Sequence, residues 1–198
     1  MQLVADNVAC VRGGREVFAR LSFSVGSGQA LLVTGGNGAG KSSLLRVLAG
    51  LVRLSGGRLS LEGRADATIG EQSHYLGHQD PVKPALSVGE NLRFWIDYLG
   101  GNGDPASALK TVGLGAVTGL PAAYLSAGQR RRLSIARLIA VKRPIWLLDE
   151  PTSALDVSAQ EMLAKLMRTH LRNRGLIVAA SHGPIGLAAT RELKLGHR

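Results

Sequence analysis

The feature that most constrains this chain is a glycine-rich stretch placed between a strand pattern and a helix pattern. Residues 29–34 form a short apolar run typical of a buried strand, and residues 41–49 have a helical pattern that Gly50 would end. A glycine-rich connection lets backbone N–H groups converge on phosphates, and the N-terminus of the following helix adds its dipole. The pattern G-x-x-x-x-G-K-S/T therefore predicts a nucleoside triphosphate site, with its binding residues at Gly35, Gly36, Asn37, Gly38, Ala39, Gly40, Lys41, Ser42 and Ser43.

A phosphate-binding loop of this kind works with a metal ion and a nearby acidic group. Lys41 would supply a mobile positive charge for the β- and γ-phosphates, and Ser42 would bind Mg²⁺. A second buried strand pattern ends in Asp149, which we expect to hold Mg²⁺ through water. Glu150 follows directly, in front of Pro151, which biases it away from a helical backbone. Glu150 is then the candidate general base for the attacking water; alternatively, the acidic pair caps a helix in the next loop.

Strand and helix patterns alternate at both ends of the chain around a more helical middle. Residues 8–11 and 16–25 alternate as strands around Gly13-Gly14, a dipeptide typical of a tight hairpin. Further strand patterns occupy residues 58–61, 73–78, 144–149, 176–180 and, as an edge strand, 191–195. This alternation predicts an α/β fold with a mainly parallel sheet. We expect a single domain over residues 1–198, with a helical insert at roughly 80–142.

Several helices carry their own start signals. Ser87 with Glu90, and Ser126 with Gln129, have the spacing of a capping box. Asp156 is placed to cap a later helix, whose apolar residues fall on one face at Ala159, Met162, Leu163 and Leu166. Residues 100–105 are expected to form a loop.

The chain is basic, since Lys and Arg outnumber Asp and Glu by 24 to 14 and the formal net charge is +10. Such a charge is compatible with nucleic acid, anionic lipid or a nucleotide as partner. Aromatic residues make up only 4% and do not alternate with the basic ones, so a base-stacking surface for nucleic acid is not indicated. We interpret the basic clusters at 130–132, 142–143 and 165–174 as solvated faces.

The cellular compartment is constrained by cysteine use and by the N-terminus. The single Cys10 excludes an internal disulfide, fits a reducing compartment and is expected inside a strand. The first residues lack the basic start and apolar block of a secretory signal, and no apolar run approaches the roughly 18 residues of a membrane span. We therefore expect a cytosolic chain, or one that reaches a membrane only through a partner.

The motifs taken together resemble those of the ATP-binding cassette (ABC) ATPases. The phosphate-binding loop, L-S-A-G-Q at 125–129, I-W-L-L-D-E-P-T-S-A-L-D at 145–156 and S-H at 181–182 occur in the order and spacing of that family. The resemblance covers essentially the whole chain. It implies a P-loop NTPase of ABC type, with a RecA-like parallel sheet, an N-terminal antiparallel part and a helical insert.

The resemblance also implies a pairing of two copies. In that family two cassettes pair head to tail around ATP. Ser126, Gly128 and Gln129 of one copy would then close over the γ-phosphate held by the other copy's loop, since a capping-box helix start can bind an anion. A lone chain should bind ATP but hydrolyse it poorly.

Further roles follow from matching positions. Gln79 is similar to the glutamine that touches Mg²⁺ and the attacking water and senses the transport partner, and His182 to the histidine that contacts the γ-phosphate and steadies the catalytic glutamate. Asp156 is similar to the aspartate that communicates across the dimer. Two positions depart from the usual pattern: Arg12 stands where an aromatic residue stacks on adenine, and Ala127 where glycine is commonest. An arginine can also stack on a base.

A single short cassette is the usual form of a separate transporter subunit, whose partners are polytopic membrane permease subunits. We expect the permease to dock beside Gln79 and the helical insert, the region of the aromatic residues Tyr75, Phe94, Trp95 and Tyr98. On helical spacing, Phe94 and Trp95 are expected to pack inside the insert instead.

A narrower similarity is to the ATP-binding subunits of bacterial haem exporters that serve cytochrome c maturation. Three features support this similarity: the short length, the missing adenine-stacking aromatic residue and the sequence segment Y-L-G-H-Q-D-P-V-K-P-A-L-S-V-G-E-N-L-R-F-W. It implies a peripheral protein on the cytoplasmic face of the bacterial inner membrane, which hydrolyses ATP to load or release haem on a chaperone. The alternatives are an ABC ATPase for lipid, peptide or drug, and a soluble nucleic-acid-associated ABC ATPase, although no specific nucleic acid is expected as a partner.

Overall fold

The computed structural model of the 198-residue chain describes residues 1–63, 68–187 and 191–196. Its internal contacts divide the chain into two compact units. The first, here the sheet unit, comprises Met1–Gly77, Arg143–Pro151 and Leu166–Arg198. The second, here the helical unit, comprises His78–Lys142 and Thr152–Lys165. None of the helices among the described residues has the length and hydropathy needed to cross a lipid bilayer.

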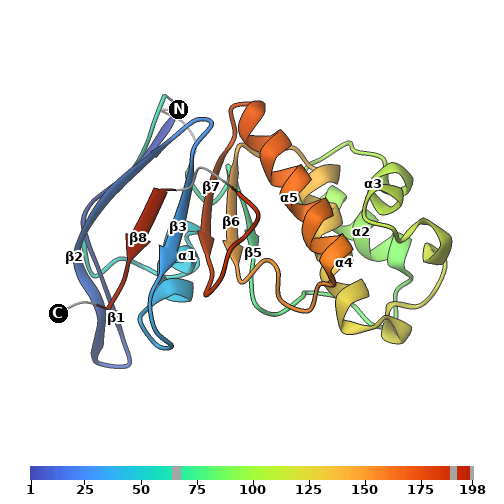
Figure 1. The fold of residues 1–198 in the computed structure, drawn as a ribbon, viewed down its shortest axis with the longest axis horizontal. Helices are drawn as coiled ribbons and strands as arrows, with labels where there is room; N and C mark the ends of the chain where they lie inside the picture. Colours follow the sequence, from blue (N-terminus) through green and yellow to red (C-terminus); the bar gives the residue numbers. More distant parts are fainter. Residues whose placement is uncertain (64–67, 188–190, 197–198) are drawn as a thin grey trace. The chain divides into compact units, whose positions relative to one another are not determined.

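The sheet unit contains an antiparallel sheet of three strands in the order β2-β1-β4 (Figure 1). These strands are β1 (Gln2–Arg12), β2 (Arg15–Gly26) and β4 (Gly56–Glu62). Arg12 pairs with Arg15 across the two glycines, whose φ angles of 55° and 75° are those of a type I′ turn. The predicted hairpin is therefore confirmed, although its first strand begins six residues earlier than residue 8, at Gln2.

A five-stranded sheet in the order β5-β6-β7-β3-β8 forms the other layer, and its neighbouring strands are all parallel. Its strands are β3 (Ala30–Thr34), β5 (Ser73–Leu76), β6 (Ile145–Asp149), β7 (Leu176–Ala180) and β8 (Arg191–Lys194). Every residue of β6 and β7 is buried, as expected for central strands of a parallel sheet covered on both faces. The α/β fold with a mainly parallel sheet and an N-terminal antiparallel part is confirmed, and β8 is the edge strand that the sequence predicted.

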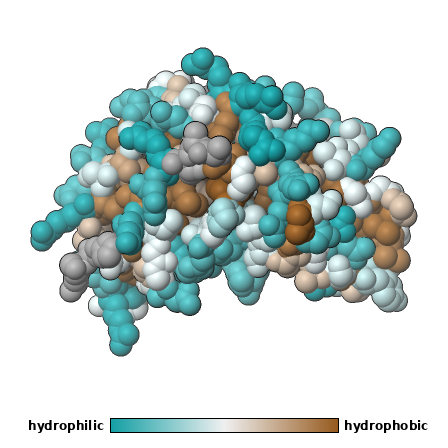
Figure 2. Space-filling model, viewed as in Figure 1, coloured by the Kyte–Doolittle hydropathy of each residue, from teal (hydrophilic) through white to brown (hydrophobic). Residues whose placement is uncertain are grey.

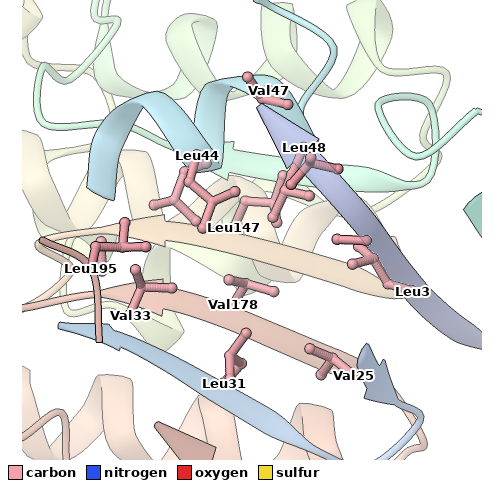
Figure 3. Packing of buried hydrophobic residues seen from close by; sticks show 14 of the residues in the cluster. Leu3, Val25, Leu31, Val33, Leu44, Val47, Leu48, Leu147, Val178 and Leu195 are labelled. Carbon is pink, nitrogen blue, oxygen red and sulfur yellow. The ribbon is translucent and has the colours of Figure 1, made fainter. Parts of the chain in front are cut away.

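The core of the sheet unit lies beneath helix α1 (Lys41–Leu48). Leu44 and Leu48 point from this helix toward Leu147 of the parallel sheet, while Leu3 of β1 contributes from the antiparallel sheet (Figure 3). All four side chains are fully or almost fully buried. Cys10 lies inside β1 and is buried in the same cluster, so its expected position in a strand is confirmed.

The helical unit is built from α2 (Val88–Tyr98), α3 (Pro105–Thr111), α4 (Ala127–Ala140) and the first part of α5 (Val157–Arg172). Two short 3₁₀ turns, Gly115–Val117 and Ala122–Tyr124, lie between α3 and α4. The prediction that residues 100–105 form a loop is wrong at its end, because Pro105 opens α3. Asp104 caps that helix by accepting from the N–H groups of Ala106 and Ser107, and proline at the first helical position needs no N–H partner.

Candidate nucleotide site

The catalytic candidates of the sheet unit lie at the carboxyl ends of three adjacent parallel strands. The phosphate-binding loop follows β3, Asp149 ends β6 with Glu150 after it, and His182 comes two residues after β7. Since β6, β7 and β3 are neighbours in that order, parallel pairing brings these segments to one edge of the sheet. Ligand sites of open parallel sheets form at this edge.

Two glycines of the loop are required by close contacts. A Cβ on Gly35, whose φ is 142°, would lie 2.5 Å from the carbonyl oxygen of Leu195. A Cβ on Gly40, whose φ is 98°, would lie 2.7 Å from Val17 Cγ1. Both positions therefore exclude a larger side chain, while Asn37 lies exposed at the tip of the loop.

Lys41 is almost fully buried, with 8% of its surface exposed, and its ammonium group folds back over the loop. Nζ donates to the carbonyl oxygens of Gly35 at 2.8 Å and Gly36 at 3.0 Å, and lies 3.3 Å from Nε2 of His182. The sequence predicted that Lys41 supplies its positive charge to the β- and γ-phosphates. The structure additionally brings His182 to the same ammonium group.

The pair expected to hold Mg²⁺ is joined by a hydrogen bond. Ser42 Oγ donates to Asp149 Oδ1 at 3.0 Å, although 107 positions separate the residues. Asp149 is 2% exposed, whereas Ser42 is half-buried. Hydroxyl and carboxylate oxygens are donors that Mg²⁺ prefers, and such sites commonly use one or two carboxylates completed by substrate phosphates. Within the described residues there is no cluster of three or more His, Cys, Asp or Glu that could hold a metal ion.

Glu150 has a left-handed backbone, with φ at 44°. The residue avoids the right-handed helical region, as its position before Pro151 predicted, but it does so with a positive φ that costs on the order of 1–3 kcal/mol. Its N–H donates to the carbonyl oxygen of Ala180 at 2.9 Å. Glu150 thereby adds a backbone hydrogen bond one residue after the last β6–β7 pair, which is Asp149 with Ala180. Ser181 Oγ donates to Glu150 Oε2 at 3.5 Å, so a buried serine helps to fix the candidate base.

His182 lies between the loop lysine and the candidate base. Its Nε2 is 3.7 Å from Glu150 Oε1, which is beyond hydrogen-bond distance, and 3.3 Å from Lys41 Nζ. One nitrogen cannot accept from Lys41 and donate to Glu150 at once. The shorter contact corresponds to the tautomer whose Nε2 carries no proton.

The signature turn L-S-A-G-Q begins α4 in the helical unit. Ser126 Oγ accepts from the N–H of Gln129 at 3.2 Å, and Gln129 Oε1 accepts from the N–H of Ser126 at 2.8 Å. The predicted capping box is confirmed, as is the one at Ser87 and Glu90 before α2. Ala127 is the first helical residue, so its methyl group is compatible with the backbone.

Gly128 and Asp156 belong to two segments of the helical unit that lie against each other. A Cβ on Gly128 would be 2.9 Å from the carbonyl oxygen of Ala154. Asp156 then caps α5, because its Oδ1 accepts from the N–H of Ala159 at 2.8 Å. The exposed Asp156 carboxylate is thus held at a helix start, as the sequence predicted.

Gln79 is exposed at the start of a loop that the helical unit anchors at three points. Its neighbour Asp80 forms an ion pair with Arg131 of α4 at 3.1 Å. Trp95 Nε1 donates to the carbonyl oxygen of Pro81 at 3.3 Å. The buried Asn91 amide donates to three loop carbonyl oxygens, of Lys83, Leu86 and Ser87, and accepts from the N–H of Lys83.

The interpretation of residues 130–132 as a solvated face is wrong for Arg131, which is 2% exposed. Its guanidinium is buried because it pairs with Asp80, and a run of three arginines on a helix cannot all face water. The Arg143 side chain also bonds to the protein backbone and not only to solvent, since its Nη1 donates to the carbonyl oxygens of Gly70 and Ser73. Arg130 and Arg132 are half-buried, whereas five basic residues of these clusters are exposed: Lys142, Lys165, Arg168, Arg172 and Arg174.

The expectation that Phe94 packs inside the insert is also wrong, since its side chain is 38% exposed. Phe94, Trp95 and Tyr98 form one aromatic cluster on α2, with Phe94 stacked on Tyr98 at a centroid distance of 6.1 Å. Trp95 is half-buried beneath the guanidinium of Arg137. Tyr75, the fourth aromatic residue of the expected docking region, belongs to β5 of the sheet unit.

Sequence reasoning also left three supporting residues without a role, namely Asp80, Asn91 and Ser181. Asp80 and Ser181 act through contacts 51 and 31 residues away, which no local pattern reveals, whereas Asn91 contacts loop residues four to eight positions before it. Phe18 is buried in the core, with 8% of its surface exposed, while Arg12 lies exposed at the end of β1. The stacking of Arg12 on adenine stays a prediction.

Comparisons with known proteins give a family match and full-length relatives. The family profile described as ABC transporter matches residues 18–153. The chain is 60% identical over 198 residues to the "Cytochrome c biogenesis ATP-binding export protein CcmA" of Nitrobacter winogradskyi, covering 99% of this chain and 98% of the relative. A protein of the same description from Mesorhizobium japonicum is 51% identical, with the same shares covered.

Solved structures share the fold. One described as a putative ABC transporter ATP-binding protein from Pyrococcus furiosus superposes with a TM-score of 0.84 at 21% identity, covering 98% of both chains. A bacterial Atm1-family ABC exporter with ATP bound gives a TM-score of 0.83 at 24% identity, with 98% of this chain and 37% of that one covered.

Proposed function

Since the chain belongs to the ABC transporter family as an ATP-binding, ATP-hydrolysing protein, we propose that it energises a haem exporter of cytochrome c biogenesis. The observation that carries the ATPase chemistry is the meeting of Lys41, Ser42, Asp149, Glu150 and His182 at one edge of the sheet. The full-length identity to relatives described as export proteins of cytochrome c biogenesis supports the choice of pathway.

The assignment of roles in the sheet unit follows from chemistry. The loop residues 35–43 bind the phosphates, with Lys41 as their cation. Ser42 and Asp149 would hold Mg²⁺, which would supply positive charge to neutralise the phosphates. Glu150 removes a proton from the attacking water, Ser181 orients its carboxylate, and His182 contacts the γ-phosphate.

The helical unit supplies the residues that act on a second copy of the chain. Ser126, Gly128 and Gln129 present a capped helix start to the γ-phosphate bound by the partner copy, in a head-to-tail dimer. Asp156, held at the start of α5, communicates between the copies, and Gln79 joins Mg²⁺ and the attacking water. The two units are proposed as parts of one ABC ATPase domain over residues 1–198, with the helical unit as its insert.

The membrane partners are proposed to be polytopic permease subunits that hold this protein at the cytoplasmic face of the bacterial inner membrane. The aromatic cluster Phe94, Trp95 and Tyr98 supports a docking surface on α2, because exposed aromatic side chains are enriched in protein interfaces. Hydrophobic side chains reach the surface in places on the face shown in Figure 2.

The pathway is tested by deleting the gene and staining for covalently bound haem. We expect c-type cytochromes to disappear, to return with the parent gene and to stay absent with a Glu150→Gln copy. Normal cytochromes in the deletion strain would exclude haem export and favour an ABC exporter for lipid, peptide or drug. Nucleic-acid binding that weakens steeply with salt would instead favour a soluble nucleic-acid-associated ABC ATPase.

The dimer is tested by disulfide cross-linking in a Glu150→Gln background. Asn37→Cys on one copy and Ser126→Cys on another should form a covalent dimer when ATP is added. Cys10 is fully buried and should not compete, which a Cys10→Ser control checks. A cross-linking yield that does not depend on ATP would contradict the head-to-tail dimer around ATP.

A further inference from the structure

We propose that Tyr75 is a positioning residue for Asp149, holding the metal-binding carboxylate through its hydroxyl, and that Arg46 fixes that hydroxyl in place. The inference rests on the proposed function, in which Asp149 and Ser42 hold Mg²⁺. Four side chains from three elements are involved: Ser42 and Arg46 of α1, Tyr75 of β5 and Asp149 of β6.

Strand register places Tyr75 on the same face of the sheet as Asp149. Tyr75 pairs with Leu147 in the parallel β5–β6 ladder, and Asp149 is two residues beyond Leu147. Side chains two apart on a strand share a face, so the aromatic ring and the carboxylate lie on one side of the sheet, on neighbouring strands. That is the side on which α1 packs, since Ser42 of the helix reaches Asp149.

The helix supplies two contacts to this face, one turn apart. Ser42 and Arg46 stand four residues apart on α1 and therefore share a helix face. Ser42 Oγ donates to Asp149 Oδ1 at 3.0 Å, and Arg46 Nε donates to the Tyr75 hydroxyl at 3.4 Å. The helix thus binds both the carboxylate and the tyrosine beside it.

The Tyr75 hydroxyl interacts with both of its neighbours. Arg46 Nε donates to its oxygen at 3.4 Å, and the hydroxyl also has a hydrogen bond with the carboxylate of Asp149. The hydroxyl can accept from Arg46 and donate its own proton to the carboxylate of Asp149.

Gly77 makes room for the tyrosine ring. A Cβ on Gly77 would lie 3.0 Å from Tyr75 Cε1 and 3.3 Å from both Cζ and the hydroxyl oxygen. A methyl group at this position would therefore press on the hydroxyl end of the ring and force it to shift. This contact is independent of the hydrogen bonds, and it fixes the same end of the same side chain.

The consequence for the site is a carboxylate oriented before the metal arrives. Groups that hydrogen-bond a metal ligand set its direction, and their removal commonly weakens metal binding by about 10- to 100-fold. Tyr75 does not itself bind the metal in this scheme. It restricts the rotation of Asp149 so that one carboxylate oxygen faces the ion beside Ser42.

The test measures metal binding directly, with Mn²⁺ as the probe. Mn²⁺ is titrated into the protein with a non-hydrolysable ATP analogue and followed by electron paramagnetic resonance. Tyr75→Phe, which keeps the ring, should bind Mn²⁺ about tenfold more weakly, while its affinity for the analogue in EDTA stays unchanged. Tyr124→Phe is the matched control, since Tyr124 is 74% exposed in the helical unit and should bind Mn²⁺ like the parent.

Two further variants disturb the same hydroxyl by other routes. Gly77→Ala pushes on the ring, and Arg46→Met removes the donor, so both should weaken Mn²⁺ binding in the direction of Tyr75→Phe. If the parent binds no Mn²⁺ with the analogue, the proposed function fails. If the parent binds Mn²⁺ and the Mn²⁺ affinity of Tyr75→Phe stays within twofold of the parent's, the positioning role is overturned. It is also overturned if Tyr75→Phe weakens binding of the analogue in EDTA as much as it weakens binding of Mn²⁺.

Discussion

His170 shows at the scale of one residue how burial changes a side chain that looked like part of a basic, solvated helix end. Its ring stacks on Trp146 with 4.0 Å between centroids and 13° between planes, and Nε2 lies 3.3 Å from the carbonyl oxygen of Leu176. A Cβ on Gly175 would collide with the ring at 2.3 Å. Burial lowers the pKa of His170, although its contacts with backbone groups partly raise it.

We predict that His170 makes the fold less stable in mild acid. Its folded pKa lies below the ordinary value of 6.5, so between the two values the unfolded chain binds the extra proton. The contribution to stability is complete above pH 6.5 and is lost as the pH falls toward the folded pKa. His170→Phe should keep the stacking and flatten the decline of Tm between pH 8 and pH 5; equal slopes in both proteins would contradict this.

Glu150 is the residue that we propose as the general base of hydrolysis. Glu150→Gln keeps the size of the side chain and the phosphate contacts but removes the general base. We expect ATP binding to persist, turnover to fall about a hundredfold or more, and a closed dimer to accumulate. Turnover assays and size-exclusion chromatography with ATP would show this, and wild-type turnover would exclude Glu150 as the base.

At the scale of elements, the loop after β5 depends on helices that come later in the chain. Asp80 pairs with Arg131 of α4, and Asn91 of α2 binds the loop backbone at several points. These bonds explain how an exposed Gln79 can be carried on a defined loop without a regular element of its own.

We predict that Asp80→Ala destabilises the helical unit by about 3 kcal/mol, because it leaves the buried Arg131 guanidinium without this carboxylate. Urea unfolding measures the change. Asp97→Ala is the control, since Asp97 is an exposed carboxylate of the same unit and its loss should change stability little. A similar effect of both substitutions would argue against the buried pair.

Gly128→Ala tests the contact between the start of α4 and the turn before α5. The added Cβ would meet the Ala154 carbonyl oxygen at 2.9 Å, so the signature turn or the segment carrying Asp156 must shift. We expect ATP hydrolysis to drop at least tenfold while ATP binding to the loop is kept. Gly119→Ala is the control, because nothing lies within 4 Å of its Cβ, and its activity should match the parent.

At the scale of the whole molecule, the division of labour between the units predicts dependence on a second copy. The proposed cation Lys41, base Glu150 and metal ligands Ser42 and Asp149 lie in the sheet unit, while the capped signature turn lies in the helical unit. If each ATP site needs the sheet unit of one copy and the signature turn of another, specific ATPase activity should rise with protein concentration. Initial rates over a hundredfold dilution series test this, and constant specific activity would contradict it.

The local elements of this protein could be read from the sequence because their causes are local. The two capping boxes and the Gly13-Gly14 turn act through neighbours within a few residues, and the structure contains all of them. The apolar runs of β6 and β7 indicated full burial for the same reason. The order of these motifs also determined the family, and with it the expected partners of Lys41 and Glu150.

Only the tertiary structure decided what each exposed or charged side chain would touch. Arg131 and Phe94 were assigned the wrong surroundings, since helix periodicity gives spacing along one helix but not which neighbours cover it. The hydrogen bonds from Arg46 to Tyr75 and from Ser42 to Asp149 depend on strand register and helix placement, across separations of 29 and 107 residues. Packing sets such contacts through the whole fold, because a shift of one residue in register would turn every side chain of β5 to the other face.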